Sequence, residues 1–409
     1  MRESQPAHFF GLDVGTSNIR CVIGMLDPAN PGELSIIGHG SSKNTGMRKG
    51  VVVHINDVVE SLVQAIAEAE RISGVNVHNV SVNINGTHIS GQNSKGVVAI
   101  SAANREISTD DRYRAEEAAA ILQIPANREI VQVFAKNYRV DGQDNIKDPI
   151  GMHGVRLEVD THIVTAATPN LKSLTTVLER ANLTINHVTI SSLAAAEAVL
   201  SRQQKESGCL LLDIGAGTTN LVVVEDGEIQ HVAVLPVGGI NITNDLAIGL
   251  KTDLDIAEMV KLRHASLEPP KSDSISLEHE GHTYSYDTDD ILMITEARVE
   301  ELLELVDKEL RKVGKSRKLP GGVIIVGGTA NLPGIAEFAR DKLQLAARIG
   351  KLQPLNGLVD VVENPSFVTA IGLMQLDMLL SPEDAPTERG LPSKKLMGLV
   401  EGLIRRVKR

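Results

Sequence analysis

Aromatic residues are scarce in this sequence: Phe, Tyr and Trp make up 2% of the 409 residues, and Trp is missing altogether. With a hydrophobic content of 42%, the cores must therefore be aliphatic. A surface that binds nucleic acid by stacking bases needs exposed rings. The formal net charge of −11 also repels polyanions. We therefore expect no nucleic acid among the partners.

Cysteine and long apolar runs are also rare. Cys21 and Cys209 each lie in an apolar strand-like stretch, which is typical of buried, reduced thiols rather than of a disulfide framework. No run approaches the roughly 20 apolar residues of a membrane-spanning helix. Residues 1–8 are polar and lack the apolar core of a signal peptide. The expected compartment is the cytoplasm.

The most informative stretch is residues 210–224. An apolar strand breaks at Asp213, passes through small residues, and becomes apolar again at Leu221. This pattern predicts a β-hairpin whose glycines let backbone N–H groups approach a phosphate. An aspartate at the strand end suits Mg²⁺, directly or through water. A plain tight hairpin is the alternative for one such loop alone.

The same order of parts occurs near the N-terminus, where Asp13 takes the place of Asp213. Each hairpin is followed by a turn rich in acids and glycine, a third strand, a helix and a strand that ends in glycine. The Asn56–Asp57 and Asn244–Asp245 pairs predict the two helix starts. The chain therefore reads as an internal duplication of a βββαβ unit.

Four further segments surround these units. Residues 85–162 are interpreted as an inserted interaction module, and residues 157–168 as a strand that returns to the main fold. Two helices rich in small residues, 192–201 and 364–380, are expected to cross between two lobes. Residues 241–297 form a smaller insert.

Gly327 and Gly328 end a predicted strand and precede a helix. This arrangement suits a base and ribose that pass close over the backbone. The alternative is a plain strand-to-helix turn.

The C-terminal region combines a linker and a basic tail. Residues 381–393 are rich in Pro and charge and cannot bury themselves. The apolar residues of the tail fall on one helical face: Leu396, Leu399, Val400, Leu403, Ile404 and Val407. Its basic residues are Lys394, Lys395, Arg405, Arg406, Lys408 and Arg409, which with Glu401 give a charge of +5. We interpret residues 394–409 as an amphipathic helix for an anionic membrane, with docking on a partner protein as the alternative.

Two Asp-Gly hairpins, a double-glycine strand and two crossing helices together resemble the actin, Hsp70 and sugar-kinase ATPase superfamily. The insertion after Gly86, the linker and the basic tail narrow the resemblance to the FtsA family of bacterial actin homologues in cell division. The resemblance implies an α/β fold, actin-like, with two duplicated lobes and an inserted subdomain in each. It also implies ATP and Mg²⁺ between the lobes.

The resemblance further implies partners and a location. Proteins of this family form filaments, bind the C-terminal peptide of FtsZ, and work with other divisome proteins. They lie on the cytoplasmic face of the inner membrane at the division septum. The FtsZ site would fall within residues 241–297.

The resemblance divides the chain into six parts. The lobe 1 core would comprise residues 8–84, 163–206 and 360–380, with the first insert at 85–162. The lobe 2 core would comprise residues 207–240 and 298–359, with the second insert at 241–297. The linker would span residues 381–393 and the membrane helix residues 394–409.

The resemblance also carries site residues over to this sequence. The first phosphate loop would use Asp13, Gly15, Thr16, Ser17 and Asn18, and the second Asp213, Gly215, Ala216, Gly217, Thr218 and Thr219. The remaining nucleotide contacts would come from Gly239, Glu258, Lys261, Gly327, Gly328, Thr329 and Asn331. Asp13 and Asp213 would hold the metal or position water; no catalytic residue is assigned beyond them.

Four positions depart from the family pattern. Asn18 stands where a lysine is common, and Ala216 and Asn220 stand where glycine and aspartate are common. Ser191 takes the place of a carboxylate that could orient the attacking water, a large part of such catalysis. We therefore expect ATP to be bound and hydrolysed slowly or not at all. The alternative function is that of a PilM-like ATP-binding protein of pilus assembly; a sugar kinase would need a catalytic aspartate that no motif nominates.

Overall fold

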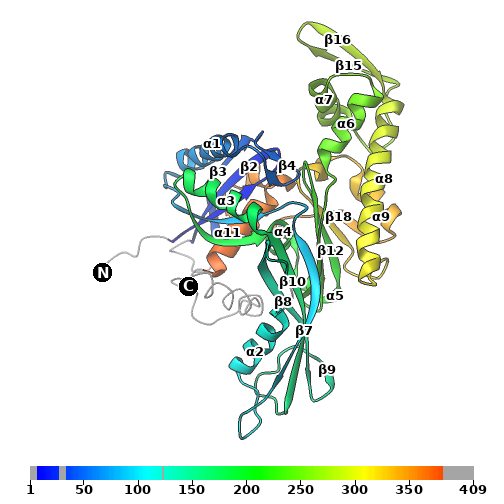
Figure 1. Cartoon of the computed structure of the whole chain (residues 1–409). Helices are drawn as coiled ribbons and strands as arrows, with labels where there is room; N and C mark the ends of the chain where they lie inside the picture. Colours follow the sequence, from blue (N-terminus) through cyan, green and yellow to red (C-terminus); the bar gives the residue numbers. More distant parts are fainter. Residues whose placement is uncertain (1–6, 27–33, 122–123, 381–409) are drawn as a thin grey trace.

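The computed structural model describes residues 7–26, 34–121 and 124–380 (Figure 1). Two large sheets form its centre, and each begins with an antiparallel three-stranded meander. The tail residues 394–409 and the linker 381–393 lie outside the described residues. In the described part of the chain, no helix is both long and apolar enough to cross a bilayer.

The lobe 1 sheet has six strands in the order β11-β6-β1-β2-β3-β19. β1 pairs antiparallel with β2 and parallel with β6, which is itself parallel to β11. The strands are β1 (His8–Val14), β2 (Asn18–Leu26), β3 (Leu34–Lys43), β6 (Asn79–Ile84), β11 (Thr184–Ile190) and β19 (Asn356–Gly357).

The lobe 2 sheet has the order β14-β13-β12-β17-β18. Its pairings repeat those of lobe 1 strand for strand: β12 is antiparallel to β13, parallel to β17, and β17 is parallel to β18. The predicted duplication is therefore confirmed in the topology. The strands are β12 (Cys209–Ile214), β13 (Thr219–Glu225), β14 (Glu228–Leu235), β17 (Val323–Val326) and β18 (Ala347–Ile349).

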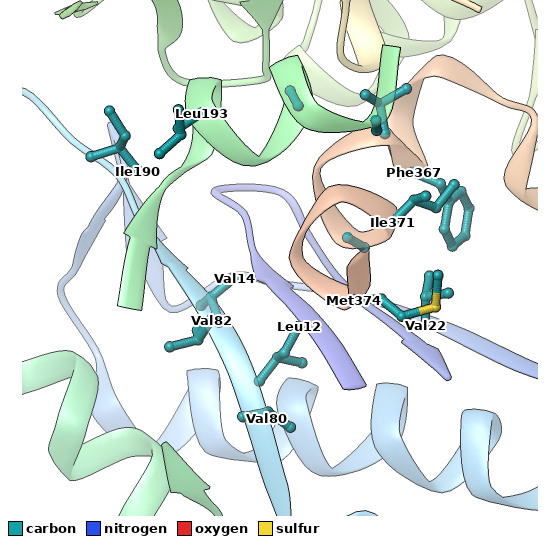
Figure 2. Packing of buried hydrophobic residues seen from close by; sticks show 14 of the residues in the cluster. Leu12, Val14, Val22, Val80, Val82, Ile190, Leu193, Phe367, Ile371 and Met374 are labelled. Carbon is teal, nitrogen blue, oxygen red and sulfur yellow. The ribbon is translucent and has the colours of Figure 1, made fainter. Parts of the chain in front are cut away.

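Helices α1 (Ile55–Ser73) and α11 (Val368–Leu380) cover opposite faces of the lobe 1 sheet. A Cβ on Gly40 would lie 1.9 Å from the Ala65 carbonyl oxygen of α1, and one on Gly11 would lie 2.0 Å from the Ala370 oxygen of α11. Glycine is therefore required for both close approaches. Figure 2 shows Leu12 and Val80 on the α1 side and Met374 on the α11 side.

Helix α4 (Ser191–Val199) lies against the lobe 2 sheet and packs on α11. A Cβ on Gly372 of α11 would lie 1.8 Å from the Ala194 oxygen of α4. The two predicted crossing helices thus meet backbone to backbone between the lobes. The second begins as a 3₁₀ turn, η2 (Pro365–Phe367), before α11.

A buried carboxylate fixes the last turns of α11 to the sheet. Asp377, 1% exposed, accepts hydrogen bonds from the Phe10 N–H (3.0 Å), the Ser81 hydroxyl (2.7 Å) and the Asn186 amide (2.9 Å). These donors lie on β1, β6 and β11. One side chain therefore ties the helix to three neighbouring strands.

The first insert has its own sheet, in the order β7-β10-β8-β9, which helix α2 (Thr109–Ala120) covers. Its strands are β7 (Ser90–Ala99), β8 (Arg128–Val140), β9 (Gln143–Ile146) and β10 (Arg156–Ala167). The prediction that residues 157–168 return to the main fold was wrong: within the insert, β10 pairs with β7 as far as Thr165 and with β8 as far as Ala167. The chain returns to lobe 1 through α3 (Thr168–Arg180) and β11.

The first insert, although it belongs to lobe 1 in sequence, docks on the edge strand β14 of lobe 2. His162 of β10 is 1% exposed, and its Nε2 accepts the Val232 N–H at 3.1 Å. Its Nδ1 therefore carries the proton and donates to the Asn93 side-chain oxygen at 2.8 Å. This contact covers an edge that would otherwise offer unpaired groups.

The second insert and its supporting helices form the outer part of lobe 2 (top of Figure 1). A hydrophobic core lies between these outer helices and the lobe 2 sheet, and Leu210, Leu212 and Ile214 of β12 belong to it. The elements are α6 (Gly239–Gly249), α7 (Leu254–His264), β15 (Ser274–His279), β16 (His282–Asp287), α8 (Thr288–Lys312) and α9 (Ile335–Leu343). The remaining short elements are β4 (Met47–Arg48), β5 (Val51–Val52), α5 (Arg202–Ser207), η1 (Gly328–Asn331) and α10 (Val359–Val362).

Both predicted helix caps were wrong. α1 begins at Ile55 after His54, which makes no side-chain capping bond. Asn244 and Asp245 lie inside α6, which begins at Gly239. Asp245 instead forms an ion pair with Arg298 of α8. The Asn-Asp pairs are therefore surface groups of the first and second turns, not helix boundaries.

Candidate functional site

Strand alternation brings the two aspartates toward each other. Along β1, Asp13 shares a face with Gly11, which touches α11. Along β12, Asp213 shares a face with Cys209 and Leu211, which belong to the inner core, whereas Leu210 and Leu212 belong to the outer one. Both carboxylates therefore lie on the inner faces of their sheets, where the lobes meet.

Burial changes the protonation of both carboxylates. It raises the pKa of Asp13 to about 7, with Arg20 opposing this shift and Asp213 adding to it. Burial also raises the pKa of Asp213 to about 6, with opposing effects from the Asn220 hydrogen bond, Arg20 and Thr369. The pair thus concentrates negative charge in a poorly solvated place, which favours a cation between the lobes.

Asn83 of β6 positions Asp13. Its amide donates to Asp13 Oδ1 (2.6 Å) and to Ser191 Oγ (2.9 Å), and its side-chain oxygen accepts the Val14 N–H (2.7 Å). Ser191, at the start of α4, is 2% exposed. The hydroxyl predicted in place of a carboxylate is thus linked to Asp13 through one amide.

The two hairpin turns close in the same way. The Gly15 N–H donates to the Asn18 carbonyl at 3.1 Å, and the Gly215 N–H donates to the Thr218 carbonyl at 2.9 Å. In lobe 1 the Asn44 side chain donates to the Gly15 carbonyl at 2.8 Å. Asn44 also donates its own N–H to the Ser17 carbonyl at 2.8 Å.

The start of α6 holds the second loop. The N–H groups of Gly239 and Ile240 donate to the carbonyls of Gly215 (2.9 Å) and Ala216 (2.8 Å). Thr329 Oγ1 also donates to the Gly215 carbonyl, at 3.1 Å. The first N–H groups of this helix therefore support the loop itself. Of the predicted second-loop residues, Thr219 is buried and donates its hydroxyl to the Val237 carbonyl at 2.9 Å.

Glu258 and Lys261 form one hydrogen-bonded cluster on α7. The Lys261 ammonium donates to Glu258 (2.6 Å), to Thr243 Oγ1 (2.8 Å) and to the Gly239 carbonyl (3.2 Å). This cluster connects α7 to the helix start that holds the second loop. The predicted residues Gly239, Glu258, Lys261 and Thr329 are therefore brought together.

Gly327 and Gly328, at the end of β17, leave the backbone uncovered by side chains of their own. Gly327 has φ +89, and a Cβ there would lie 2.6 Å from Asp213 Oδ1, so glycine is required. A Cβ on Gly328 would meet nothing within 4 Å. Asn331 bonds the Gly328 carbonyl (3.1 Å) and Asn364 (3.2 Å). Gly328 thus leaves open space beside the strand end.

Arg20 supplies a positive charge that sequence reasoning missed. It stands opposite Asp13 in the β1–β2 register, and its guanidinium carbon lies 5.3 Å from the centroid of the Phe367 ring. Burial lowers its pKa, and Asp13 and Asp213 oppose that shift. The residue is two positions after Asn18 and so shares its strand face.

The residues present fit a magnesium ion. Mg²⁺ is usually held by one or two carboxylates together with phosphate oxygens and water, and Asp13 and Asp213 provide two carboxylates. Among the described residues, no group of three His, Cys, Asp or Glu side chains could form a closed metal cage. An ion here would therefore depend on the ligand it accompanies.

Asn44 and Asn83 were missed as well. One signal was available: Ser81, Asn83 and Asn85 alternate as polar residues within an apolar strand, and the structure buries the first two. Buried polar side chains at every second position indicate a polar task on one sheet face.

A separate polar cavity of about 760 Å³ opens between the first insert and the β13–β14 turn. Lys95, Lys136, Lys147, Asp160 and Glu225 are among its lining residues. None of the predicted nucleotide residues lines it, so it is distinct from the carboxylate pair.

Two family models match the chain. Residues 210–372 match a family described as cell division protein FtsA. Residues 86–165 match a family described as the SHS2 domain inserted in FtsA. The second match covers the first insert described above.

Curated relatives match over most of the chain. The chain is 37% identical to cell division protein FtsA of Bacillus subtilis over 90% of its length and 82% of the relative. It is 35% identical to FtsA of Pseudomonas aeruginosa, over 89% and 88%. It is 34% identical to FtsA of Neisseria meningitidis, over 100% and 98%.

Solved structures show the same fold at low identity. A PilM–PilN complex of type IV pilus biogenesis superposes with a TM-score of 0.65 at 16% identity, covering 90% of this chain and 98% of the other. MreB5 of Spiroplasma citri, solved with AMPPNP, superposes with a TM-score of 0.53 at 12% identity, covering 90% and 95%. These likenesses establish an actin-like ATPase fold.

Proposed function

The chain belongs to the FtsA family of cell-division proteins, and from this we propose that it binds Mg·ATP between its lobes, polymerises on the inner membrane and tethers the FtsZ ring there. The observation that carries the nucleotide part is the convergence of Asp13 and Asp213 on the inner faces of two duplicated sheets. Burial raises the pKa of both groups, so a bound cation would relieve their repulsion.

We assign the parts of the nucleotide by chemistry. Asp13 and Asp213 would hold Mg²⁺, which when bound neutralises phosphate charge. The two closed turns would receive the phosphates, and the backbone at Gly327 and Gly328 would lie against the adenosine. A protein of the same fold has been solved with AMPPNP, which supports a nucleotide as the ligand.

Slow hydrolysis is part of the proposal. Ser191 is neutral and accepts a hydrogen bond from Asn83, so this position supplies no carboxylate to orient water. ATP would then serve to hold the lobes together. Phosphate release at the rate of an efficient ATPase would contradict this assignment.

Membrane attachment would come from residues 394–409. The six basic residues and the apolar face of this segment suit an anionic bilayer, where each Lys or Arg contributes about 1 kcal/mol near the lipid. Removing 394–409 should abolish liposome binding and leave ATP affinity unchanged. Binding that survives this deletion would show that the tail is not the anchor.

The second insert is our candidate for the FtsZ peptide. It exposes apolar side chains on three helices: Ile248 (77%), Leu254 (57%), Leu262 (72%) and Met293 (60%). Exposed apolar groups at this density suit a peptide that buries its own apolar residues. Leu262→Ser should weaken binding of the FtsZ C-terminal peptide, and Val63→Ser on α1, with 49% exposure, is the matched control.

One sample tests the nucleotide, filament and membrane parts of the proposal. Full-length protein is sedimented with anionic liposomes and ATP, imaged by electron microscopy, and monitored for phosphate release. Membrane-bound filaments with negligible phosphate release support the proposal. Soluble monomers with rapid phosphate release would favour an enzyme and overturn it.

The PilM-like alternative shares the fold, as the TM-score of 0.65 shows. At 16% identity this likeness does not extend to function, whereas the FtsA relatives reach 37%. A pilus protein would also have no need of the basic tail.

A further inference from the structure

A short turn from lobe 1 lies against both hairpins. Lys49 and Gly50 connect β4 and β5, with φ +50 and +74. This left-handed pair is the backbone of a tight hairpin turn, in which Asn-Gly is the favoured sequence. Lysine at the first position is therefore conformationally disfavoured, so its side chain is the feature that needs explaining.

The turn is bound to the first loop. The Gly50 N–H donates to Thr16 Oγ1 at 3.0 Å, and Gly50 is buried. A Cβ on Gly50 would lie 2.7 Å from the Gly86 Cα. The position of the turn is thus fixed by the Thr16 hydroxyl on one side and by the Gly86 backbone on the other.

The turn also touches the second loop. A Cβ on Gly217 would lie 2.9 Å from the Thr16 methyl group and 3.2 Å from the Lys49 Cα. Beside it, the Asn85 amide donates to Thr218 Oγ1 at 3.1 Å. The first loop, the second loop and the Lys49 turn therefore meet at Gly217.

The charge of Lys49 is uncompensated. Its side chain is exposed, and no other group in the described part of the chain forms an ion pair or hydrogen bond with its ammonium. Asn18, in the first loop, is neutral. A polyphosphate between the loops would need cations besides Mg²⁺, since it carries several negative charges.

We propose that Lys49 is a phosphate-binding residue: its ammonium contacts the polyphosphate of the nucleotide held between the two hairpins. This inference rests on the nucleotide site proposed above and adds a third chain segment to it. The left-handed backbone and the Thr16 bond hold the residue at the junction of the loops, so that binding does not require the turn to move.

The test compares Lys49→Asn with Lys49→Arg. Asparagine tolerates the left-handed backbone better than lysine, so Lys49→Asn should fold with an unchanged or higher melting temperature. Calorimetry should show about tenfold to hundredfold weaker binding of Mg·ATP, the range of a lost charged hydrogen bond. Adenosine affinity should be unchanged, and Lys49→Arg should stay within a few-fold of the wild type.

Lys251→Asn is the matched control. Lys251 is also exposed and has φ +52, but it follows α6 in the second insert. The ATP affinity of the Lys251→Asn variant should equal that of the wild type.

The outcomes separate this inference from the proposed function. A wild-type chain that binds ATP, together with a Lys49→Asn variant that binds it equally well, overturns the inference alone. Equal losses for adenosine and ATP also overturn it, because they would indicate a structural role. A wild-type chain that binds no ATP overturns the proposed function and the inference together.

Discussion

The two lobes repeat one sheet, but different chemical groups hold the hairpin loop in each lobe: a side-chain amide in lobe 1 and a backbone N–H in lobe 2. In each lobe the segment after the third strand donates to the carbonyl of the first turn glycine. In lobe 1 the donor is the Asn44 side chain on Gly15 (2.8 Å), and in lobe 2 it is the Gly239 backbone on Gly215 (2.9 Å). The duplicated strands preserve the position of the aspartate, while the segment that supports each loop has diverged.

The residues across from the two aspartates differ as well. Arg20 is the cross-strand partner of Asp13, and Asn220 is that of Asp213. One carboxylate thus faces a cation and the other an amide. The comparison shows that the duplicated sheets fix the positions of the two carboxylates. The residue on the neighbouring strand, Arg20 or Asn220, determines whether each carboxylate is paired with a cation or with a neutral amide.

Among these predictions, disrupting the contact between helices α4 and α11 should have the largest effect on stability. Gly372→Leu would drive a side chain into the Ala194 backbone of α4. Overpacking against backbone should lower the free energy of unfolding by about 3 kcal/mol. Gly328→Ala, where a Cβ meets nothing within 4 Å, should leave stability unchanged in the same urea titration. Equal midpoints for the two variants would mean that the helices are not tightly packed.

Neutralising each aspartate in turn sharpens the comparison. Asp13→Asn and Asp213→Asn should each weaken Mg·ATP binding by about tenfold to hundredfold in calorimetry, because each removes a charged ligand. Without nucleotide, Asp13→Asn should melt below Asp213→Asn, because Arg20 loses its cross-strand carboxylate. The reverse order of melting temperatures would contradict this account of charge balance.

Acid should affect lobe 2 through the first insert. Lobe 1 extends its outer strand β3 with β19, whereas lobe 2 covers β14 with the insert and His162. Burial lowers the pKa of His162 from 6.5 to about 3, with the nearby His231 and Lys136 adding to the effect. At this residue the folded state therefore binds fewer protons than the unfolded state, and the contribution of His162 to stability falls as the pH drops below 6.5.

At pH 5 the loss should be about 2 kcal/mol. His162→Gln keeps an acceptor for the Val232 N–H and removes the titration of this residue. On going from pH 7 to 5 the variant should therefore keep about 2 kcal/mol more stability than the wild type keeps, because Asp13 and Asp213, whose pKa values burial raises, contribute equally to both proteins. Urea titrations at both pH values measure this difference. An unchanged pH dependence in His162→Gln would assign the effect to other groups, such as His231, whose pKa burial also lowers.

Much of the fold could be predicted because repetition is visible along the chain. The meander around Asp13 and the one around Asp213 share spacing and composition, and the two sheets share one strand order. A continuous apolar run also identified β12, whose side chains divide between two cores. Local pattern was sufficient where pairing was local.

Prediction failed where distant segments compete. β10 has an apolar pattern that suits either sheet, and only its pairing with β7 and β8 decides between them. The Asn-Asp pairs look like caps, but Asp245 has a better partner in Arg298. The Asn-Asp pairs therefore do not set the starts of α1 and α6.

The sequence patterns nominated the two loops of the candidate site but not the residues that support these loops. Asn83, Asn44 and Lys49 reach the loops from other strands and turns, and their sequence separation hides this role. Asn83 is 70 residues from Asp13. Only the polar alternation of β6 hinted at it.

Asp377 mechanically couples the end of α11 to the lobe 1 sheet. The described part of the chain ends with this helix, so a pull on that end is transmitted first to its last turns. Asp377 spreads the pull over β1, β6 and β11 through three hydrogen bonds. A chain anchored at its C-terminal end would transmit tension directly into the sheet that carries Asp13.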